Sequence, residues 1–400
     1  MEREKSIKIQ SPGGAHSLGQ LAMRRLKRNR LAVAGVAIIA LAALISVLGS
    51  WLRPDASVNA NEQMLQIARQ KPGFSVDVAL ITRNTEIEST PFWRRLFLGG
   101  KVSATKAYPI HSYFFEDDEL VIEEYNGRNK EIRGREMRFH LADVVWPLAD
   151  QDVRTEADGT IIATAVDGSQ HRALKGDLQA QIEASMLTRR TYWLGTDKFG
   201  RDLLSRLMGG TFVSLSVGLI SVLISLVIGI SLGAVAGYFR GWVDELIMWL
   251  INVMWSVPTL LLVMAITLAL GKGFVQVFIA VGLTMWVEVA RVVRGQVISL
   301  REQEFVEAGH ALGFRAPRII GRHILPNVMA PVIVLSAANF ASAILIEAGL
   351  SFLGIGAQIP MPSWGQMIKE HYSYITTDLA YLAVLPGVCI MLLVLAFMLV

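Results

Sequence analysis

The stretch "EFVEAGHALGFRAPRIIGRHILPN", residues 304–327, is charged, is punctuated by glycines, and lies between two very apolar runs. Its first part supports a short helix with Phe305, Ala308 and Leu312 on one face. Gly313 follows at the place where a residue in the left-handed conformation commonly ends a helix. The stretch therefore predicts a helix that stops at a glycine turn.

The second part of the same stretch predicts the other arm of a hairpin. Pro317 suits the first turn of a helix. Ile319, Ile320 and Ile324 lie along one side of that helix, and Pro326 is expected to mark a turn into the next apolar run. Helices this short are hardly stable alone in water, so their apolar side needs a partner surface, in this chain or in another protein.

The composition indicates a membrane protein. Of the 400 residues, 52% are hydrophobic and only 18% are charged, which is more apolar than a soluble domain of this length. The net charge is +4, but the basic residues gather beside apolar runs, which favours a membrane-orienting signal over a nucleic-acid surface. The single cysteine, Cys389, lies in an apolar run and is interpreted as a packing residue.

Six apolar runs approach or exceed the length of about 20 residues that a helix needs to cross a bilayer. They are residues 31–52, 210–237, 243–270, 274–293, 328–348 and 379–400. The expected fold is an all-α polytopic membrane protein with six transmembrane helices. Because the last run reaches the final residue, the sequence leaves open whether a further tail follows.

Basic residues predict the orientation. The segment RRLKRNR, residues 24–30, precedes the first run, and cytoplasmic flanks carry an excess of Lys and Arg. We therefore expect a cytoplasmic N-terminal segment, 1–30, and an uncleaved first span, since the apolar run is longer than that of a signal peptide. Alternation of the spans then places the hairpin in the cytoplasm and residues 53–190 outside.

The region 53–190 predicts an inserted extracytoplasmic α+β domain. Residues 112–125 and 159–174 contain β-branched and aromatic runs beside Asn-Gly and Asp-Gly turns, which indicates strands. Some helix is expected around residues 61–69. No metal-binding or catalytic spacing occurs there, and contact with an external partner is an alternative to a simple solvated surface.

The hairpin carries a resemblance to a known family. EAGHALG followed by HILPN resembles the EAA loop of ABC importer permeases, in which Glu-Ala-Ala, three residues, Gly, nine residues, Ile, one residue and Leu-Pro follow one another. The matching residues are Glu307, Ala308, Gly313, Leu325 and Pro326. Gly309 replaces the third alanine, and His323 replaces the isoleucine. The resemblance implies an ATPase-coupling loop near residues 300–326 that comprises Glu304, Glu307, Ala308, Gly309, Gly313, Arg318, His323, Leu325 and Pro326.

Two further segments are similar to the second permease of the dipeptide, oligopeptide and nickel branch of this family. Residues 192–215 resemble the segment before the second span, with the motif residues Gly195, Thr196, Asp197, Gly200, Arg201 and Asp202. Residues 347–368 resemble the loop between the last two spans. Together with the first span, the resemblance covers the chain from about residue 191 onward, whereas 53–190 departs from the family pattern.

The resemblance implies a permease subunit that forms half of the pathway of an ATP-driven importer in the bacterial inner membrane, most often for peptides. The implied partners are a second homologous permease, two cytoplasmic ATPase subunits, an extracytoplasmic binding protein and the lipid bilayer, with no nucleic acid. The sequence has no phosphate-binding loop, so ATP and Mg²⁺ are expected on the ATPases, with no cofactor and no enzymatic activity in this chain. The substrate, the identity of the partners and the role of 53–190 are left open.

Several residues of the apolar runs are candidates for the pathway or for a helix interface. They are Ser221, Ser225, Gly229, Asn252, Pro258 and Asn339. Gly229, Gly233 and Gly237 recur at every fourth position, which predicts close helix packing or, alternatively, a moving interface between two permeases. Pro258 is expected to break the backbone ladder of the third run.

Glu288 is an acidic residue expected near the cytoplasmic end of the fourth run. Arg291, one turn away, favours a local ion pair over a proton or substrate site. Two rival functions follow from other features: a membrane-anchored receptor whose region 53–190 binds an external ligand, and an ion-driven transporter that uses Glu288.

Overall fold

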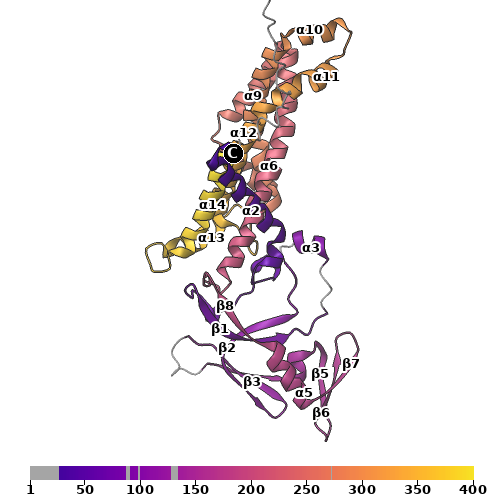
Figure 1. The fold of residues 1–400 in the computed structure, drawn as a ribbon, viewed down its shortest axis with the longest axis vertical. Helices are drawn as coiled ribbons and strands as arrows, with labels where there is room; N and C mark the ends of the chain where they lie inside the picture. Colours follow the sequence, from indigo (N-terminus) through magenta and orange to yellow (C-terminus); the bar gives the residue numbers. More distant parts are fainter. Residues whose placement is uncertain (1–26, 87–90, 98–99, 128–133, 272) are drawn as a thin grey trace, which may run out of the picture.

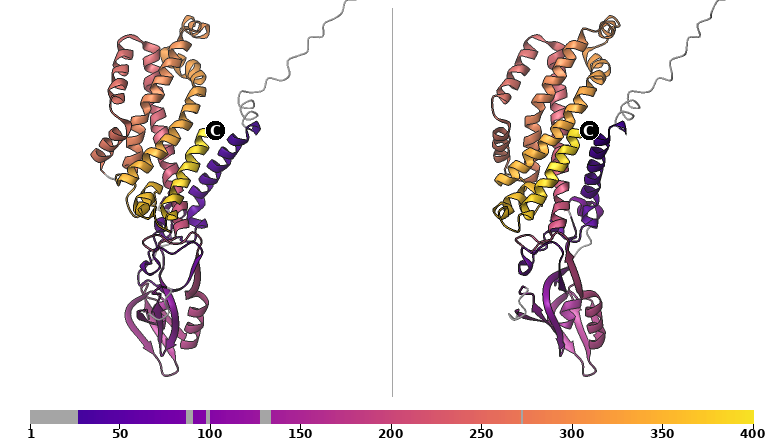
Figure 2. Two further views of the ribbon diagram at one scale, coloured as in Figure 1. Left: turned by 90° about the vertical axis from the view of Figure 1, so that its left-hand side faces the viewer. Right: turned by 60° about the vertical axis from the view of Figure 1, so that its left-hand side comes forward.

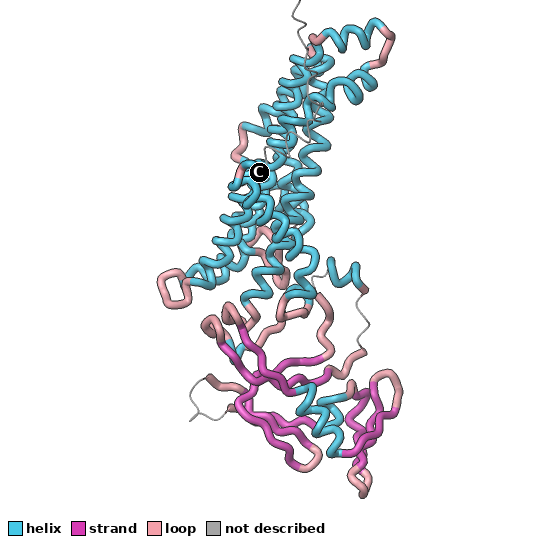
Figure 3. Tube along the Cα trace, viewed as in Figure 1, coloured by secondary structure: helices cyan, strands magenta, loops and turns pink. Residues whose placement is uncertain are grey.

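The computed structural model describes residues 27–400 except 87–90, 98–99, 128–133 and 272. A long bundle of helices carries a β-rich domain at one end and a small helical hairpin at the other (Figure 1). The strands are confined to the β-rich end (Figure 3). Residues 1–26 of the predicted N-terminal segment lie outside the described residues.

The bundle follows the predicted apolar runs. Its helices are α2 (Arg30–Leu52), α6 (Leu203–Phe239), α7 (Gly241–Trp255), α8 (Thr259–Leu270), α9 (Phe274–Arg301), α10 (Glu304–Ala311), α11 (Ala316–Ile319), α12 (Leu325–Leu353), α13 (Trp364–His371) and α14 (Tyr381–Leu399). Among the described residues, five helices are long and apolar enough to cross a membrane, and a sixth crossing results if the bent pair α7–α8 counts as one. Figure 2 shows α2 beside α14 at the side of the bundle.

The third apolar run is broken, as Pro258 predicts. α7 ends at Trp255, α8 begins at Thr259, and their axes differ by 92°. Pro258 caps α8 with φ −54° and ψ 128°, outside the helical region. Proline has no N–H to donate and so removes one hydrogen bond from the ladder, and at Pro258 the helix breaks.

The turn expected at Pro326 is wrong. α11 continues through a π-helical turn, Ile320–Ile324, directly into α12, so that residues 316–353 form one long helix. The N–H of Leu325 donates to the carbonyl of Ile320 in the wide turn. Pro326 then falls in the first turn of α12, where a missing N–H is tolerated.

α6 and α9 pack along each other through the glycine series of α6. A Cβ atom added at Gly233 would lie 2.5 Å from the carbonyl oxygen of Ala290, and one at Gly237 would lie 2.8 Å from that of Arg294. Only glycine allows the two backbones this close. The series therefore packs inside one chain, and the alternative of a moving interface between two permeases is wrong for these residues.

The β-rich domain contains two antiparallel sheets. Its strands are β1 (Phe74–Thr82), β2 (Thr105–Glu116), β3 (Glu119–Glu124), β4 (Glu136–His140), β5 (Leu148–Thr155), β6 (Thr160–Ala165), β7 (Gln170–Leu174) and β8 (Leu187–Tyr192), and its short helices are α3 (Phe92–Phe97), α4 (Leu141–Val145) and α5 (Lys175–Gln181). The sheet orders are β4-β3-β2-β1-β8 and β5-β6-β7. Because β1 pairs with β8, the first and last strands of the domain lie side by side, next to its two connections to the bundle.

The strands predicted at 112–125 and 159–174 are confirmed as the hairpins β2–β3 and β6–β7. The helix expected around 61–69 is wrong apart from one short 3₁₀ turn, Leu65–Ile67. The backbone there bonds across the domain boundary instead, for example from the N–H of Met64 to the carbonyl of Phe199. Backbone groups that make such long-range bonds are not available for the hydrogen bonds of a helix.

Candidate functional site

Gly313 closes the hairpin formed by α10 and α11. Its φ is 76°, in the left-handed region. The N–H of Gly313 donates to the carbonyl of His310 at 2.9 Å. The N–H of Phe314 donates to the carbonyl of Gly309 at 3.0 Å. These two bonds make a Schellman motif, which confirms the predicted end of the first arm.

The inner side of the hairpin belongs to the core of the spans. Val306, Ile319 and Ile324 are fully buried. The cluster that they join consists of Ala234, Tyr238, Val289, Val293, Val297, Val306, Ile319, Ile324, Val328 and Val332. Since these residues come from α6, α9, α12 and the hairpin, any displacement of the hairpin must move side chains between the spans.

The outer side of the hairpin carries the apolar face predicted for the first arm. Leu312 is 72% exposed and Phe305 is 41% exposed, and Ala308 lies exposed between them. Glu304 and Glu307 are exposed on the same helix. In the part of the chain that the structure describes, nothing covers this face.

Two side chains of the second arm pack against Phe314, the residue after the glycine turn. The guanidinium of Arg318 lies 4.0 Å from the ring centroid of Phe314, and the ring of His323 stacks on Phe314 with centroids 5.8 Å apart. Leu325 is half-buried and Pro326 is exposed. Arg318 and His323 therefore hold the residue that follows the glycine turn.

Tyr238, near the end of α6, contributes to the hairpin and was not predicted. Its hydroxyl lies 2.9 Å from Nε2 of His310, and the guanidinium of Arg301 lies 5.6 Å from its ring centroid. At the same end of the bundle, Nη2 of Arg294 donates to Asp244 at 2.6 Å. These contacts connect α6, α7, α9 and α10 through polar side chains that are far apart in sequence.

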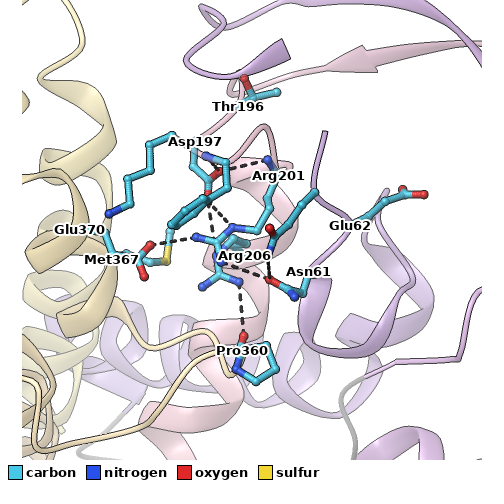
Figure 4. A network of polar contacts seen from close by, with 12 residues as sticks. Asn61, Glu62, Thr196, Asp197, Arg201, Arg206, Pro360, Met367 and Glu370 are labelled. Atoms are coloured by element: carbon cyan, nitrogen blue, oxygen red, sulfur yellow. Dashed lines mark hydrogen bonds and ion pairs between the residues drawn. The ribbon is translucent and has the colours of Figure 1, made fainter. Parts of the chain in front are cut away.

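The family segment 195–202 forms a buried ionic cluster at the other end of the spans (Figure 4). Arg201 donates from Nε to Asp197 at 2.6 Å and from Nη2 to Glu370 at 2.8 Å. Nε of Arg206 lies 3.8 Å from Asp197. All four side chains are at most 4% exposed. Two cations and two anions balance, which is the condition under which buried ions are tolerated.

The cluster joins three parts of the chain. Nη1 of Arg201 donates to Oδ1 of Asn61, at the start of the β-rich domain, at 3.2 Å. Nη1 of Arg206 donates to the carbonyl of Pro360, between α12 and α13, at 3.5 Å. Asn61 and Pro360 were not predicted, because no local signal marks partners more than 100 residues away.

The glycines of the segment allow it to wrap around residues 64–70. Gly195 and Gly200 have φ values of 77° and 73°. A Cβ atom at Gly200 would lie 1.8 Å from the carbonyl oxygen of Met64. The hydroxyl of Thr196 accepts a hydrogen bond from the N–H of Gln70 at 2.8 Å. The motif thus fastens the β-rich domain to the start of α6.

Asp202 starts α6. Its Oδ2 accepts a hydrogen bond from the N–H of Ser205 at 2.8 Å, as an N-cap residue does. Burial raises the pKa of the Asp202 carboxyl, against the lowering effect of the Ser205 hydrogen bonds. Asp202 is therefore a structural cap.

Asp197, Glu370 and His371 offer ligand atoms within 4.8 Å of one another. Both carboxylates already pair with Arg201. Nδ1 of His371 lies 2.8 Å from the carbonyl oxygen of Met367 and donates to it. The arrangement is therefore an ion-pair cluster rather than a metal centre.

Ser221, Ser225 and Gly229 lie inside the chain. The hydroxyl of Ser221 donates to the carbonyl of Phe278 on α9 at 3.0 Å. The hydroxyl of Ser225 donates within α6, and a Cβ atom at Gly229 would lie 2.5 Å from Cβ of Val289. Ser221 and Gly229 lie in the α6–α9 contact, which fits the helix-interface role of the two roles predicted for them.

Asn252 and Pro258 lie exposed near the break between α7 and α8. Asn339 of α12 is 2% exposed, and its Nδ2 has no hydrogen-bond partner among the described residues. Asn252 and Pro258 are thus each exposed, whereas Asn339 lies in the interior.

The ion pair predicted between Glu288 and Arg291 is wrong. The guanidinium of Arg291 lies 3.5 Å from the ring centroid of Trp255 on α7. Glu288 is exposed at the edge of a cavity of about 220 Å³ that Trp255, Thr284 and Ser342 also line. Within the described residues Glu288 has no ion-pair partner. Arg291 makes a cation–π contact with Trp255 instead of an ion pair with Glu288, and such a contact is itself stabilising.

Two protein-family models match parts of the chain. Residues 229–400 match the family model described as binding-protein-dependent transport system inner membrane component. Residues 17–72 match the model for the N-terminal TM domain of oligopeptide transport permease C. Neither model extends over residues 73–228, which include the β-rich domain.

Curated relatives come from several bacteria. The chain is 43% identical to the dipeptide transport system permease protein DppC of Alkalihalophilus pseudofirmus over 206 residues. This alignment covers 52% of this chain and 67% of that protein. It is 39% identical to the glutathione transport system permease protein GsiD of Pectobacterium atrosepticum, covering 52% and 68%. It is 37% identical to the oligopeptide transport system permease protein OppC of Bacillus subtilis, covering 47% and 62%. A solved structure of the MetNI methionine ABC transporter aligns with 48% of this chain and 91% of its own at a TM-score of 0.41 and 19% identity.

Proposed function

Because the chain belongs to the binding-protein-dependent transport system inner membrane components, with the dipeptide and oligopeptide permeases as relatives, we propose that it forms half of the translocation pathway of an ATP-driven importer for peptides. A second, homologous permease supplies the other half. An extracytoplasmic binding protein delivers the substrate, and two cytoplasmic ATPase subunits bind ATP and Mg²⁺.

One observation carries the coupling step. The hairpin exposes Phe305, Ala308 and Leu312 on its outer side while its inner side, with Val306 and Ile319, is part of the packed core of the spans. A protein that binds the outer face therefore gains mechanical contact with α6, α9 and α12. We assign this outer face to the ATPase, whose closure on ATP would shift the hairpin and with it the spans.

The same arrangement supports the orientation that we propose. The hairpin and the β-rich domain lie at opposite ends of the bundle (Figure 1). With the hairpin and the N-terminus in the cytoplasm, the β-rich domain is extracytoplasmic, where it meets the binding protein or the outer mouth of the pathway. The basic residues near the hairpin, such as Arg315 and Arg322, agree with a cytoplasmic position.

Peptides are the proposed substrate class because the relatives transport dipeptides, oligopeptides and glutathione according to their names. The curated relatives match only up to about half of this chain, and the β-rich domain leaves room for a different selectivity at the outer face. The receptor alternative has no observation in its favour, since the relatives are transport permeases.

The test is uptake by proteoliposomes that contain the chain, its partner permease and the ATPases, with binding protein added outside. We expect labelled di- and tripeptides to accumulate only with ATP inside, and accumulation to persist when ion gradients are collapsed. Leu312→Asp should abolish uptake, whereas Leu174→Asp, at an exposed site in the β-rich domain, should not. Uptake that follows an ion gradient and ignores ATP would refute the proposal.

A further inference from the structure

The short helix α3 lies beside the end of α2, where the bundle meets the β-rich domain (Figure 1). Its sequence, FWRRLF, combines aromatic residues with two arginines. Phe92 is 52% exposed and Trp93 is 67% exposed. A soluble domain rarely leaves two neighbouring aromatic side chains in water without a use for them.

Contacts with the end of α2 hold α3 in place. The ring of Phe92 stacks on Trp51 of α2 with centroids 5.2 Å apart. The guanidinium of Arg95 lies 4.5 Å from the ring centroid of Trp51, and its Nη2 donates to the carbonyl of Ser50 at 2.7 Å. The position of α3 is therefore fixed relative to the end of the first span.

The chain after α3 is tied to the same place. The N–H of Gly100 donates to the carbonyl of Arg95 at 3.0 Å, and the N–H of Lys101 donates to that of Ala56 at 2.9 Å. Gly100 has a φ of 152°, and a Cβ atom there would lie 2.2 Å from the carbonyl oxygen of Ser57. The close approach requires glycine and keeps α3 next to the residues that leave α2.

The exposed face of α2 leads to α3. Leu41, Leu44, Leu48 and Leu52 recur at helical spacing and are 38–58% exposed. In a membrane this stripe faces lipid. Trp51, Phe92 and Trp93 follow where the stripe ends, and aromatic residues are enriched where a span reaches the membrane–water interface.

We propose that α3 is an interfacial anchor that lies in the headgroup region of the outer leaflet, with Phe92 and Trp93 at the boundary of the acyl chains. The cationic side chains Arg95 and Lys101 complement the phosphates of the headgroups. The anchor adds a membrane contact to the two chain connections and to the contacts of residues 195–202 that fasten the β-rich domain to the bundle. The domain is thereby held in a constant orientation above the membrane.

The test measures the depth of a spin label in the full chain, assembled with its partner permease in nanodiscs of phosphatidylethanolamine and phosphatidylglycerol. Cys389 is first replaced by serine. Labels are then placed with Trp93→Cys and Phe92→Cys, and with two matched controls on exposed leucines. Leu44→Cys reports the acyl region, and Leu174→Cys reports the water around the β-rich domain.

We expect the labels at 92 and 93 to collide with oxygen more than with a water-soluble nickel chelate, at a ratio between those of the two controls. A ratio equal to that of Leu174→Cys would overturn the proposal, since α3 would then lie in water. Low collision with both reagents would also overturn it, because the face would then be covered by protein. The result does not depend on which substrate the complex transports.

Discussion

Gly309 and Gly313 lie four residues apart, yet the structure places different demands on them. Gly313 needs a positive φ of 76°. Gly309 stands inside α10, and a Cβ atom there would meet Ile319 and Phe314 at 3.7 Å, an ordinary contact distance. The alanine that the family pattern places at position 309 would thus fit, and the substitution found in this chain is not forced by packing.

This difference predicts opposite effects of the same substitution. Gly309→Ala should stabilise the chain by about 0.5–1 kcal/mol, because alanine loses less backbone entropy in a helix. Gly313→Ala should destabilise it by roughly 1–2 kcal/mol, the cost of a left-handed Cβ residue. Thermal unfolding midpoints in mild detergent measure both. Equal shifts in the same direction would show that the hairpin does not have this geometry.

His371 predicts a dependence on pH. Burial lowers its pKa from the ordinary value of 6.5. The folded state therefore binds a proton less readily than the unfolded state, and the free energy of unfolding falls as the pH drops through about 6.5. The unfolding midpoint should decrease between pH 7.5 and 5.5.

The same loss should be smaller in His371→Gln. Since burial also lowers the pKa of His140, His140→Gln is the matched variant for the β-rich domain, and the double variant should show the smallest dependence. If the unfolding midpoint of His371→Gln falls with pH as steeply as that of the wild type, protonation of His371 at the end of α13 is not the cause of the lost stability.

At the scale of single residues, the sequence predicts what depends on neighbours in the chain. The glycine turn at 313 could be predicted because the left-handed requirement is local. The pair of Glu288 and Arg291 could not, since Trp255, which captures Arg291, belongs to another helix. Tyr238 was missed for the same reason, because its partner His310 lies 72 residues away.

Among the elements, α6 and α9 pack closely through glycines. Gly233→Ala should destabilise the bundle by about 1–3 kcal/mol, the cost of forcing extra volume into a packed interface, because the new Cβ atom would meet the backbone of Ala290 at 2.5 Å. Gly295→Ala, in α9, meets nothing within 4 Å and should raise the stability slightly. Unfolding midpoints in detergent compare the two, and a neutral Gly233→Ala would contradict the close approach.

The limits of helices could be predicted only in part. Pro258 breaks its run, as predicted from the hydrogen-bond donor that proline lacks, although Pro331 and Pro386 stand inside unbroken helices. Pro326 does not end its helix, since the preceding π-helical turn moves it to a position where that donor is not needed. The sequence shows both prolines alike, and only the register of the surrounding turns distinguishes them.

For the whole molecule, the hydropathy of the chain predicts the bundle and the turn dipeptides predict the β-hairpins, because both signals are local. The fastening of the two parts is not local. Arg201 reaches Asn61 across 140 residues and Glu370 across 169 residues. Charged residues before a span indicate that other polar groups of the chain pair with them. Only the fold shows which groups these are.

The central claim is that the outer face of the hairpin binds the ATPase. Its most direct test is co-purification, in mild detergent, of the tagged chain with the partner permease and the ATPases, for the wild type, Glu307→Arg, Leu312→Asp and the control Leu174→Asp. The two hairpin substitutions are at exposed residues and should leave the fold intact. We predict that both lose the ATPase at least tenfold and keep the partner permease, while the control keeps both. Equal recovery of the ATPase with all four proteins would contradict the account.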